Sequence, residues 1–243
     1  MFVDTRLRSN EPEIMDDFNM EGEILRDALD KIASINRLLG GNKVTLQGIE
    51  LLLTNMEKTQ EVRILDVGCG NGDMLRVLAD YATKNGYKFS LTGIDANDFT
   101  IRHAQSLSFN YHNISFRCAD IFEEIKQAPG YDIILCTLTL HHFKDQEILD
   151  LLGGFKARSN VGIVINDLQR SAIAYYLFIA LCWVFGLNKM SRDDGLVSIL
   201  RGFKKPDLKH YANKLDLTQY RIRWKWAFRY QWIIKNTAEK GHI

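Results

Sequence analysis

The 243-residue sequence has few cysteines, few prolines and almost no net charge. Its four cysteines stand singly, without the paired spacing of zinc or redox sites, which favours reduced, buried thiols and a cytoplasmic protein over disulfides or a metal site. Only three prolines occur, and they form no proline-rich linker. With a formal net charge of +1, the chain gives no reason to expect nucleic acid as a partner.

One apolar run raises the question of a membrane. Residues 172–187 contain no charged side chain, but at about 1.5 Å per residue they reach roughly 24 Å, short of a hydrocarbon core of roughly 30 Å. We expect a buried or pocket-lining helix rather than a transmembrane span, and peripheral contact with a lipid surface is the alternative. The acidic N-terminus lacks the apolar segment of a signal peptide, so none is expected.

The order of the elements indicates an α/β fold. Apolar, β-branched runs alternate with amphipathic segments, which is typical of a parallel sheet with helices on both faces. Residues 218–234 alternate polar and apolar side chains and predict an antiparallel C-terminal strand pair. We therefore predict a Rossmann-like, doubly wound, mostly parallel seven-stranded sheet. The parallel strands are expected at residues 62–67, 88–94, 114–118, 131–138 and 161–166.

Two further segments are expected to cover one end of this sheet. Residues 1–60 contain two amphipathic helices and predict an N-terminal helical cap. Residues 61–243 form the domain that contains the sheet. Within it, residues 170–204 are expected to lie over a pocket, as an apolar helix followed by a polar loop at 188–198.

The most informative stretch passes from a strand through a glycine-rich turn into a helix. Its motif, Asp-x-Gly-x-Gly-x-Gly, runs from Asp66 to Gly72. A dinucleotide site needs a glycine at the sixth position from Gly68, where Asp73 stands, and a phosphate loop needs a Gly-Lys-Ser/Thr that does not follow. The carboxylate suits a ligand with an ammonium group better than a pyrophosphate, which it would repel.

This motif resembles the first motif of class I S-adenosylmethionine-dependent methyltransferases, and the resemblance extends over residues 62–142. It implies S-adenosylmethionine as cofactor, S-adenosylhomocysteine as product, and a methyltransferase domain at residues 61–243. An acid after the second strand, Asp95, suits the two ribose hydroxyls, while Asp120 can accept from the adenine amino group or simply cap a helix. The predicted cofactor-binding residues are Asp66, Gly68, Cys69, Gly70, Gly72, Asp95, Ala96, Asp120, Ile121 and Leu138.

Two side chains at neighbouring strand ends are candidates for catalysis. His141 follows the fourth strand and Asp167 follows the fifth, so they can lie within hydrogen-bonding distance. Proton transfer from a phenol, with a pKa of about 10, to a histidine, with a pKa of about 6.5, is uphill by roughly 5 kcal/mol. A carboxylate on the far ring nitrogen makes histidine a stronger base and fixes its tautomer. The alternative is a structural histidine that binds loop backbone.

The flanking segments carry a narrower resemblance. Residues 8–16, 35–37, 166–171 and 193–198 are similar to a bacterial group of methyltransferases encoded beside polyketide and aromatic-lipid biosynthesis genes, distantly similar to ubiquinone-pathway enzymes. Those relatives have His-Asp-Gly where this chain has Asp193-Asp194-Gly195. The resemblance implies a small aromatic acceptor. The residues predicted to line its pocket are Met15, His142, Arg170, Tyr175, Asp194 and Arg229.

Together these features predict a methyltransferase that transfers a methyl group to an oxygen of a small phenolic, polyketide-like molecule, with a His–Asp general base. C-methylation of an aromatic or quinone ring and non-catalytic binding of S-adenosylmethionine are the alternatives. A macromolecular substrate is disfavoured because the chain has no basic domain and no Asn-Pro-Pro-Tyr-type motif after the fourth strand. The protein is expected to be a monomer or a homodimer.

Overall fold

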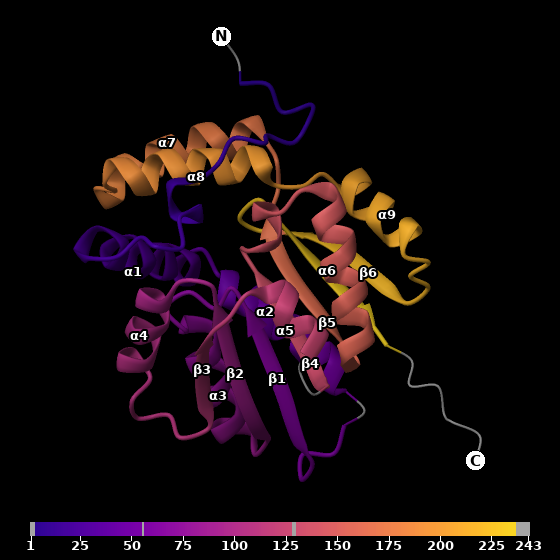
Figure 1. The fold of residues 1–243 in the computed structure, drawn as a ribbon. Helices are drawn as coiled ribbons and strands as arrows, with labels where there is room; N and C mark the ends of the chain where they lie inside the picture. Colours follow the sequence, from indigo (N-terminus) through magenta and orange to yellow (C-terminus); the bar gives the residue numbers. More distant parts are fainter. Residues whose placement is uncertain (1–2, 55, 128–129, 237–243) are drawn as a thin grey trace.

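A seven-stranded sheet forms the centre of the computed structural model, which describes residues 3–54, 56–127 and 130–236 (Figure 1). The strand order is β3-β2-β1-β4-β5-β7-β6. The first five strands are parallel, and β7 is antiparallel to both β5 and β6. The strands are β1 Glu61–Val67, β2 Lys88–Asp95, β3 Ile114–Cys118, β4 Tyr131–Thr137, β5 Ser159–Leu168, β6 Tyr220–Lys225 and β7 Arg229–Lys235. The predicted fold class is confirmed.

Helices cover both faces of the sheet because its central strands are apolar on both sides. One core lies under α2, α3 and α4 and includes Ile49, Leu75 and Ile101. The other lies under α5, α6 and α9 and includes Phe155 and Trp232. These helices are α2 Gly41–Leu53, α3 Asp73–Asn85, α4 Asp98–Leu107, α5 Ile121–Gln127, α6 Asp145–Arg158 and α9 Lys205–Lys214.

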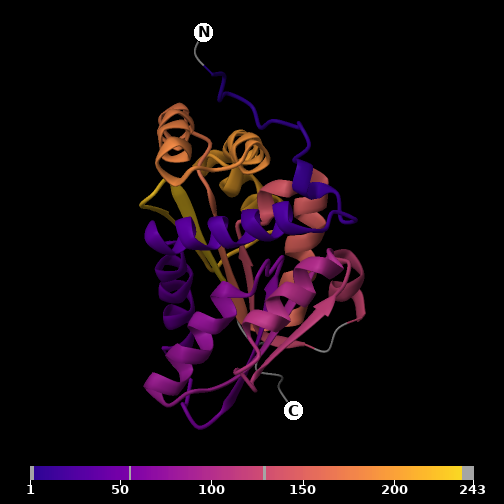
Figure 2. The same ribbon diagram turned by 90° about the vertical axis from the view of Figure 1, so that its left-hand side faces the viewer.

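A third group of elements crosses the carboxyl edge of the parallel strands. This upper layer consists of the short 3-10 helix η1 Ile14–Asp16 and the helices α1 Glu23–Leu38, α7 Ala172–Phe185 and α8 Lys189–Arg201. Figures 1 and 2 show α1 running across the sheet beneath α7 and α8. Of the two helices predicted in residues 1–60, only α1 belongs to this layer, since α2 packs on the face of the sheet.

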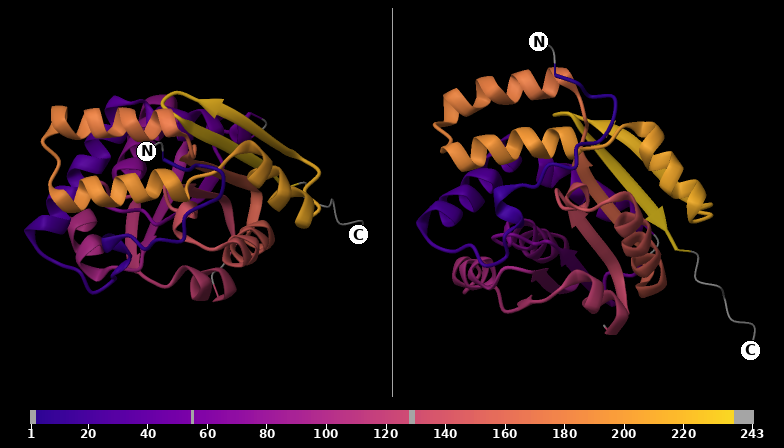
Figure 3. Two further views of the ribbon diagram at one scale, coloured as in Figure 1. Left: turned by 90° about the horizontal axis from the view of Figure 1, so that it is seen from above. Right: turned by 45° about the horizontal axis from the view of Figure 1, so that its top comes forward.

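The prediction of a polar loop at residues 188–198 is wrong, because residues 189–198 lie in the helix α8. The Asn188 side chain caps the helix by accepting a hydrogen bond from the Ser191 N–H at 2.8 Å. Gly195 lets α8 approach α7 closely, since a Cβ atom there would lie only 2.3 Å from the ring of Phe178. Figure 3 shows the two helices side by side. The polar composition of this segment favoured a loop in the sequence, whereas in the structure it forms a helix that packs against α7.

Of the two expectations for the apolar helix α7, burial or a place in a pocket lining, the second holds, since Phe178 and Leu181 line a cavity while the outer face of the helix is exposed. Only Ala174 and Cys182 are buried on it, whereas Trp183 is 86% exposed and Val184 is 79% exposed. No helix in the described part of the chain is long and apolar enough to cross a membrane.

The prediction of buried thiols holds for three of the four cysteines. Cys69, Cys136 and Cys182 are buried, and all four thiols are free. Cys118 is exposed because it ends β3, the edge strand of the sheet.

Candidate active site

A cavity of about 1130 Å³ lies between the carboxyl ends of the strands and the upper layer. This is slightly more than the roughly 300–1,000 Å³ typical of a small-molecule site. The cavity brings together most of the side chains predicted from the sequence. Its lining includes Met15, Asp66, Gly68, Cys69, Gly70, Asp95, Ala96, Asp120, Ile121, Leu138, His141, His142, Asp194 and Arg229.

The glycine-rich turn holds the backbone against the next strand end. Gly68 has a φ of 66°, and a Cβ atom there would lie 2.5 Å from the Thr139 side chain, so only glycine fits without displacement. The Gly70 N–H donates to Asp95 Oδ2 at 3.2 Å, and the Asn97 N–H donates to Asp95 Oδ1 at 3.1 Å. Burial raises the pKa of Asp95 although these N–H groups oppose the shift. The turn therefore presents a carboxylate to the cavity in a fixed orientation.

Asp66 is a second carboxylate at this edge of the sheet. Its side chain is buried at the end of β1, and Oδ1 has no hydrogen-bond partner among the described residues. Burial, with a smaller contribution from the charge of Asp95, raises the pKa of Asp66 to about 7. A positively charged ligand group in the cavity would supply the missing partner.

The residues that follow β3 and β4 also line the cavity. Asp120 Oδ1 accepts from the Phe122 N–H at 2.7 Å at the start of α5, so the helix-cap interpretation is correct, and Asp120 nevertheless lines the cavity. Leu138 has a φ of 53°, unusual for a residue with a side chain. Its N–H donates to the Asn166 carbonyl at 2.9 Å, which turns the chain away from β4.

The structure brings His141 and Asp167 into direct contact. The His141 ring Nδ1 lies 2.7 Å from Asp167 Oδ1, and the His141 backbone N–H donates to Asp167 Oδ2 at 3.2 Å. Burial alone would raise the pKa of Asp167, but the His141 ring and the Leu168 N–H hold it below its ordinary value. Because Nδ1 faces a carboxylate, it is the donor of this hydrogen bond, whereas Nε2 has no hydrogen-bond partner among the described residues.

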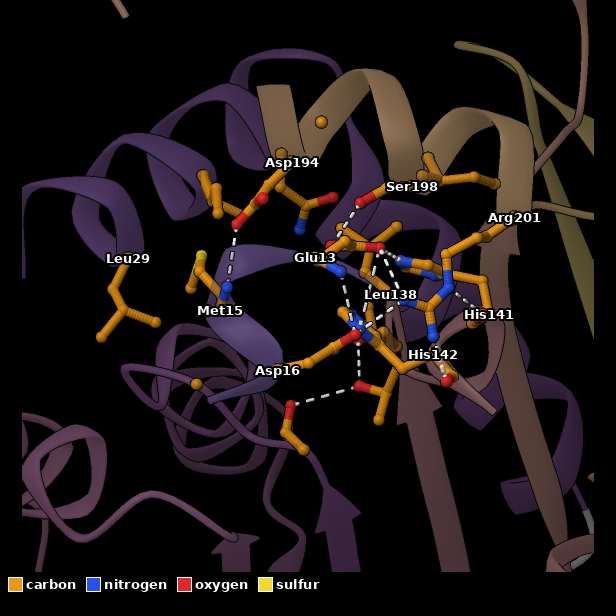
Figure 4. Close-up of a pocket in the computed structure, with 18 of the residues that line it drawn as sticks. Glu13, Met15, Asp16, Leu29, Leu138, His141, His142, Asp194, Ser198 and Arg201 are labelled. Atoms are coloured by element: carbon orange, nitrogen blue, oxygen red, sulfur yellow. Dashed lines mark hydrogen bonds and ion pairs between the residues drawn. The ribbon is translucent and has the colours of Figure 1, made fainter. Parts of the chain in front are cut away.

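Five side chains of the upper layer and of the loop after β4 surround the His141 ring (Figure 4). The Arg201 guanidinium pairs with Asp16 Oδ2 at 2.7 Å and also contacts the carbonyls of His141 and His142. His142 Nδ1 lies 2.7 Å from Asp16 Oδ1. Glu13 Oε2 accepts from the Ser198 hydroxyl at 2.7 Å. The contacts of Glu13 and Asp16 with Ser198 and Arg201 thus hold η1 against α8, above the ends of the parallel strands.

Two other predicted pocket residues shape the cavity through backbone and side-chain contacts. Asp194 accepts from the Ile14 and Met15 N–H groups at 2.7 and 3.0 Å and so caps η1. Arg229 donates through Nη1 to Asn36 Oδ1 at 2.6 Å, while its Nε has no partner among the described residues. Burial lowers the pKa of Arg229 to about 10, against the opposing charge of Asp167.

Four predicted site residues lie outside the cavity lining: Asp167, which contacts it only through His141, and Gly72, Arg170 and Tyr175. Arg170 is buried and donates to the carbonyls of Thr5 and Gly202 at 3.0 and 2.6 Å, so it holds the N-terminal segment instead of a pocket. Tyr175 packs edge-on against Tyr176. Gly72 is the N-cap residue directly before α3, and a Cβ atom on it would lie 2.7 Å from the Phe116 ring.

The sequence also left unassigned several residues that the structure places at the site, above all Glu13, Ser198 and Arg201. Glu13 and Arg201 are separated by most of the chain, so no local spacing could pair them. The spacing of Glu13 and Asp16 matches a capping box, which the structure contains, and this spacing was the one signal in the sequence that could have indicated a role for Glu13.

The structure also contains a group of possible metal ligands. Ligand atoms of Glu13, His141 and His142 lie within 4.8 Å of one another, a grouping that the prediction of no metal site did not consider.

The buried Asp66 carboxyl generates a prediction about stability. Its raised pKa means that ionisation in the folded protein costs stability, which is lost as the pH rises through about 7. Without added ligand, Asp66→Asn should therefore raise the free energy of unfolding at pH 8 by a few kcal/mol, and by less at pH 5. Chemical denaturation at both pH values measures this. Asp150→Asn, an exposed carboxylate of α6, is the control, and an equal effect of Asp66→Asn at both pH values would contradict the account.

Comparison with known proteins agrees with this geometry. A family model described as a methyltransferase domain matches residues 58–168. The ubiquinone biosynthesis O-methyltransferase of Coxiella burnetii (strain Dugway 5J108-111) is 28% identical over 158 residues, which cover 63% of this chain and 62% of that protein. The corresponding protein of Rickettsia felis is 30% identical over 53% of this chain and 50% of its own length. The chain thus matches less than two thirds of the length of these relatives.

Solved structures show the same fold at low sequence identity. The plantazolicin methyltransferase BpumL, in complex with a pentazolic desmethylPZN analog and SAH, is 20% identical, covers 88% of this chain and 90% of its own, and gives a TM-score of 0.67. Magnesium protoporphyrin IX methyltransferase from Synechocystis PCC 6803 gives 0.55 at 12% identity, over 92% of this chain and 89% of its own. Residues 58–168 thus match a methyltransferase domain, and the predicted resemblance to class I S-adenosylmethionine-dependent methyltransferases is confirmed.

Proposed function

We propose that this protein is an S-adenosylmethionine-dependent methyltransferase that methylates a hydroxyl oxygen of a small aromatic molecule. The observation that carries the proposal is the free Nε2 of His141 at the cavity that the glycine-rich turn, Asp66 and Asp95 also line. A base and a set of cofactor contacts at one cavity are the parts that such a transfer needs.

The cofactor would lie along the ends of β1, β2 and β4. The unpartnered Asp66 carboxyl suits its ammonium group, and Asp95, at the end of β2, suits the ribose hydroxyls. Asp120 and Ile121 would contact the adenine, and Leu138 the methionine part. When bound, S-adenosylmethionine supplies a methyl group on a positively charged sulfur.

His141 would remove the proton of the acceptor hydroxyl. The bound cofactor would supply the methyl group to the acceptor oxygen, with the electron pair of the broken sulfur–methyl bond staying on sulfur, while His141 Nε2 would take the hydroxyl proton. Asp167 holds the ring in the required tautomer and stabilises the imidazolium that results. The His141 and Asp167 side chains are only 3% and 2% exposed, and this burial strengthens the electrostatic interaction between them.

Several features support a small, largely apolar acceptor. The wall opposite the strand ends is formed by apolar side chains of α1 and α7, among them Leu29, Ile32, Phe178 and Leu181. Phe122 and Phe143, which pack edge to face, lie beside the predicted adenine contacts. The names of the relatives from Coxiella burnetii and Rickettsia felis refer to O-methylation in ubiquinone biosynthesis. C-methylation of a ring could use the same base and stays the alternative, and the cytoplasmic location and the monomer or homodimer stay predictions.

A screen with purified protein and labelled S-adenosylmethionine against phenols, polyketides and amines tests the proposal. On any acceptor found, we expect His141→Ala to lower kcat by about 10²–10⁴-fold and Asp167→Asn by about 10²-fold, because each removes part of the base. Affinity for S-adenosylhomocysteine should change little. His112→Ala, an exposed histidine beyond the cavity lining, is the matched control. Turnover that survives His141→Ala would rule out the base assignment.

We also propose that the outer face of α7 contacts a lipid surface. The helix has no charged side chain, and Ile173, Trp183 and Val184 are each at least 65% exposed on it. Its inner face lines the cavity, so an apolar acceptor could enter from lipid past this helix.

Co-sedimentation with phosphatidylcholine vesicles measures this contact. Replacing Trp183 and Val184 by serine should weaken binding about tenfold or more, because it removes two apolar side chains that would enter the lipid. Phe109→Ser, which replaces an 84% exposed residue after α4, should bind like the unchanged protein. Protein that stays in the supernatant, or equal binding by the double variant, would exclude the lipid contact.

A further inference from the structure

Two buried polar atoms face each other at the cavity without partners. Glu13 Oε1 and His141 Nε2 are 3.7 Å apart, and the two side chains are 4% and 3% exposed. Neither atom has a hydrogen-bond partner among the described residues. The other oxygen of Glu13 is occupied by the Ser198 hydroxyl, and the other ring nitrogen of His141 by Asp167. Figure 4 shows both side chains directed at the same part of the cavity.

The distance between these atoms indicates a shared third atom. Hydrogen bonds to oxygen span about 2.5–3.2 Å, so 3.7 Å is too long for a direct bond between them. One oxygen placed about 2.8 Å from each atom bridges the gap. Leaving two buried polar atoms unpaired is costly, so a bridging oxygen, of a water or of a ligand, would stabilise both.

The hydrogen count decides how the hydroxyl of an acceptor would fit between them. Since His141 carries its proton on Nδ1, Nε2 can only accept. A hydroxyl has one hydrogen, which it gives to Nε2, so its second neighbour must donate. Glu13 can donate only as a neutral carboxylic acid. Burial raises the pKa of Glu13, although the neighbouring His142, Ser198 and Arg201 oppose the shift, and Asp16 favours it.

We propose that Glu13 is a second catalytic residue, whose carboxylic acid donates a hydrogen bond to the acceptor oxygen while that oxygen donates to His141 Nε2. This inference rests on the proposed methyl transfer. A phenolic oxygen bound in this way keeps one lone pair free to attack the methyl group. When its proton moves to Nε2, the Glu13 O–H remains bonded to the developing oxyanion and stabilises it.

The arrangement selects hydroxyl over amine acceptors. The nitrogen of a neutral amine has a single lone pair, and the hydrogen bond from Glu13 would occupy the pair needed for attack. The same pair of residues that favours O-methylation therefore opposes N-methylation. This substrate class follows from the Glu13–His141 geometry and does not depend on the identity of the ring.

A metal ion held by Glu13, His141 and His142 is the competing interpretation. Two contacts oppose it. Arg201 Nη1 lies 3.8 Å from Glu13 Oε1 and would repel a cation there. His142 Nδ1 already lies 2.7 Å from Asp16 Oδ1 and would have to give up that hydrogen bond.

Infrared difference spectroscopy tests the protonation of Glu13 directly. With S-adenosylhomocysteine present, the spectrum of the unchanged protein minus that of Glu13→Gln at pH 7 should contain the band of a protonated carboxyl group, since the subtraction removes the contribution of Asp66. Absence of this band would overturn the proposal. Cobalt(II) titration is the second arm: visible absorption bands lost in both Glu13→Gln and His142→Ala would replace the proposal with a metal site.

Turnover on an acceptor from the screen provides the functional readout. Glu13→Gln keeps a donor and should retain kcat/KM within about tenfold, whereas Glu13→Met, which keeps the length but has no donor, should lose at least a further tenfold. Equal activity of the two variants would overturn the role of Glu13 as a donor. Calorimetry with S-adenosylhomocysteine separates this outcome from failure of the proposed function, because both variants should bind it like the unchanged protein.

Discussion

Burial of negative charge at the carboxyl edge of the sheet is the constraint on which the rest of this structure depends. A buried carboxylate must be paired, hydrogen-bonded or neutralised. Asp167 is paired with His141, and Asp95 accepts two backbone N–H groups. Asp66 has no comparable partner for Oδ1 in the described part of the chain. The fold therefore compensates the Asp167 carboxylate internally, whereas the Asp66 carboxylate can still be compensated by a bound ligand.

The same constraint explains why the upper layer lies where it does. Arg201 brings a positive charge from α8 to Asp16 and to the loop after β4. Asp194, from the same helix, accepts the N–H groups of η1. These buried polar contacts hold Glu13 over His141 with one oxygen unused. The residues that cover the cavity thus also complete the surroundings of the acceptor oxygen.

Much of this arrangement could be predicted from the sequence because it is local. The glycine spacing, the acids at strand ends and the order of strands and helices are all encoded within short segments. His141 and Asp167 could be paired because their strands are adjacent, with Thr137 opposite Asn166. Arg170 follows β5, as does the predicted pocket. Its side chain instead donates to the N-terminal segment, and no local sequence pattern indicates this direction. Glu13 and α8 were missed for a related reason, since their roles depend on contacts between distant parts of the chain.

The central claim is that the Asp66 carboxylate pairs with the ammonium group of the ligand. Titration calorimetry of S-adenosylhomocysteine binding at pH 6, in buffers of different ionisation enthalpy, tests this claim most directly. Asp66 is mostly protonated at this pH in the empty protein, since its pKa is about 7. Pairing with the ligand's ammonium group requires the carboxylate, so the account predicts binding with release of close to one proton, and loss of that release in Asp66→Asn. Absence of binding at millimolar ligand, or binding without proton release, would contradict it.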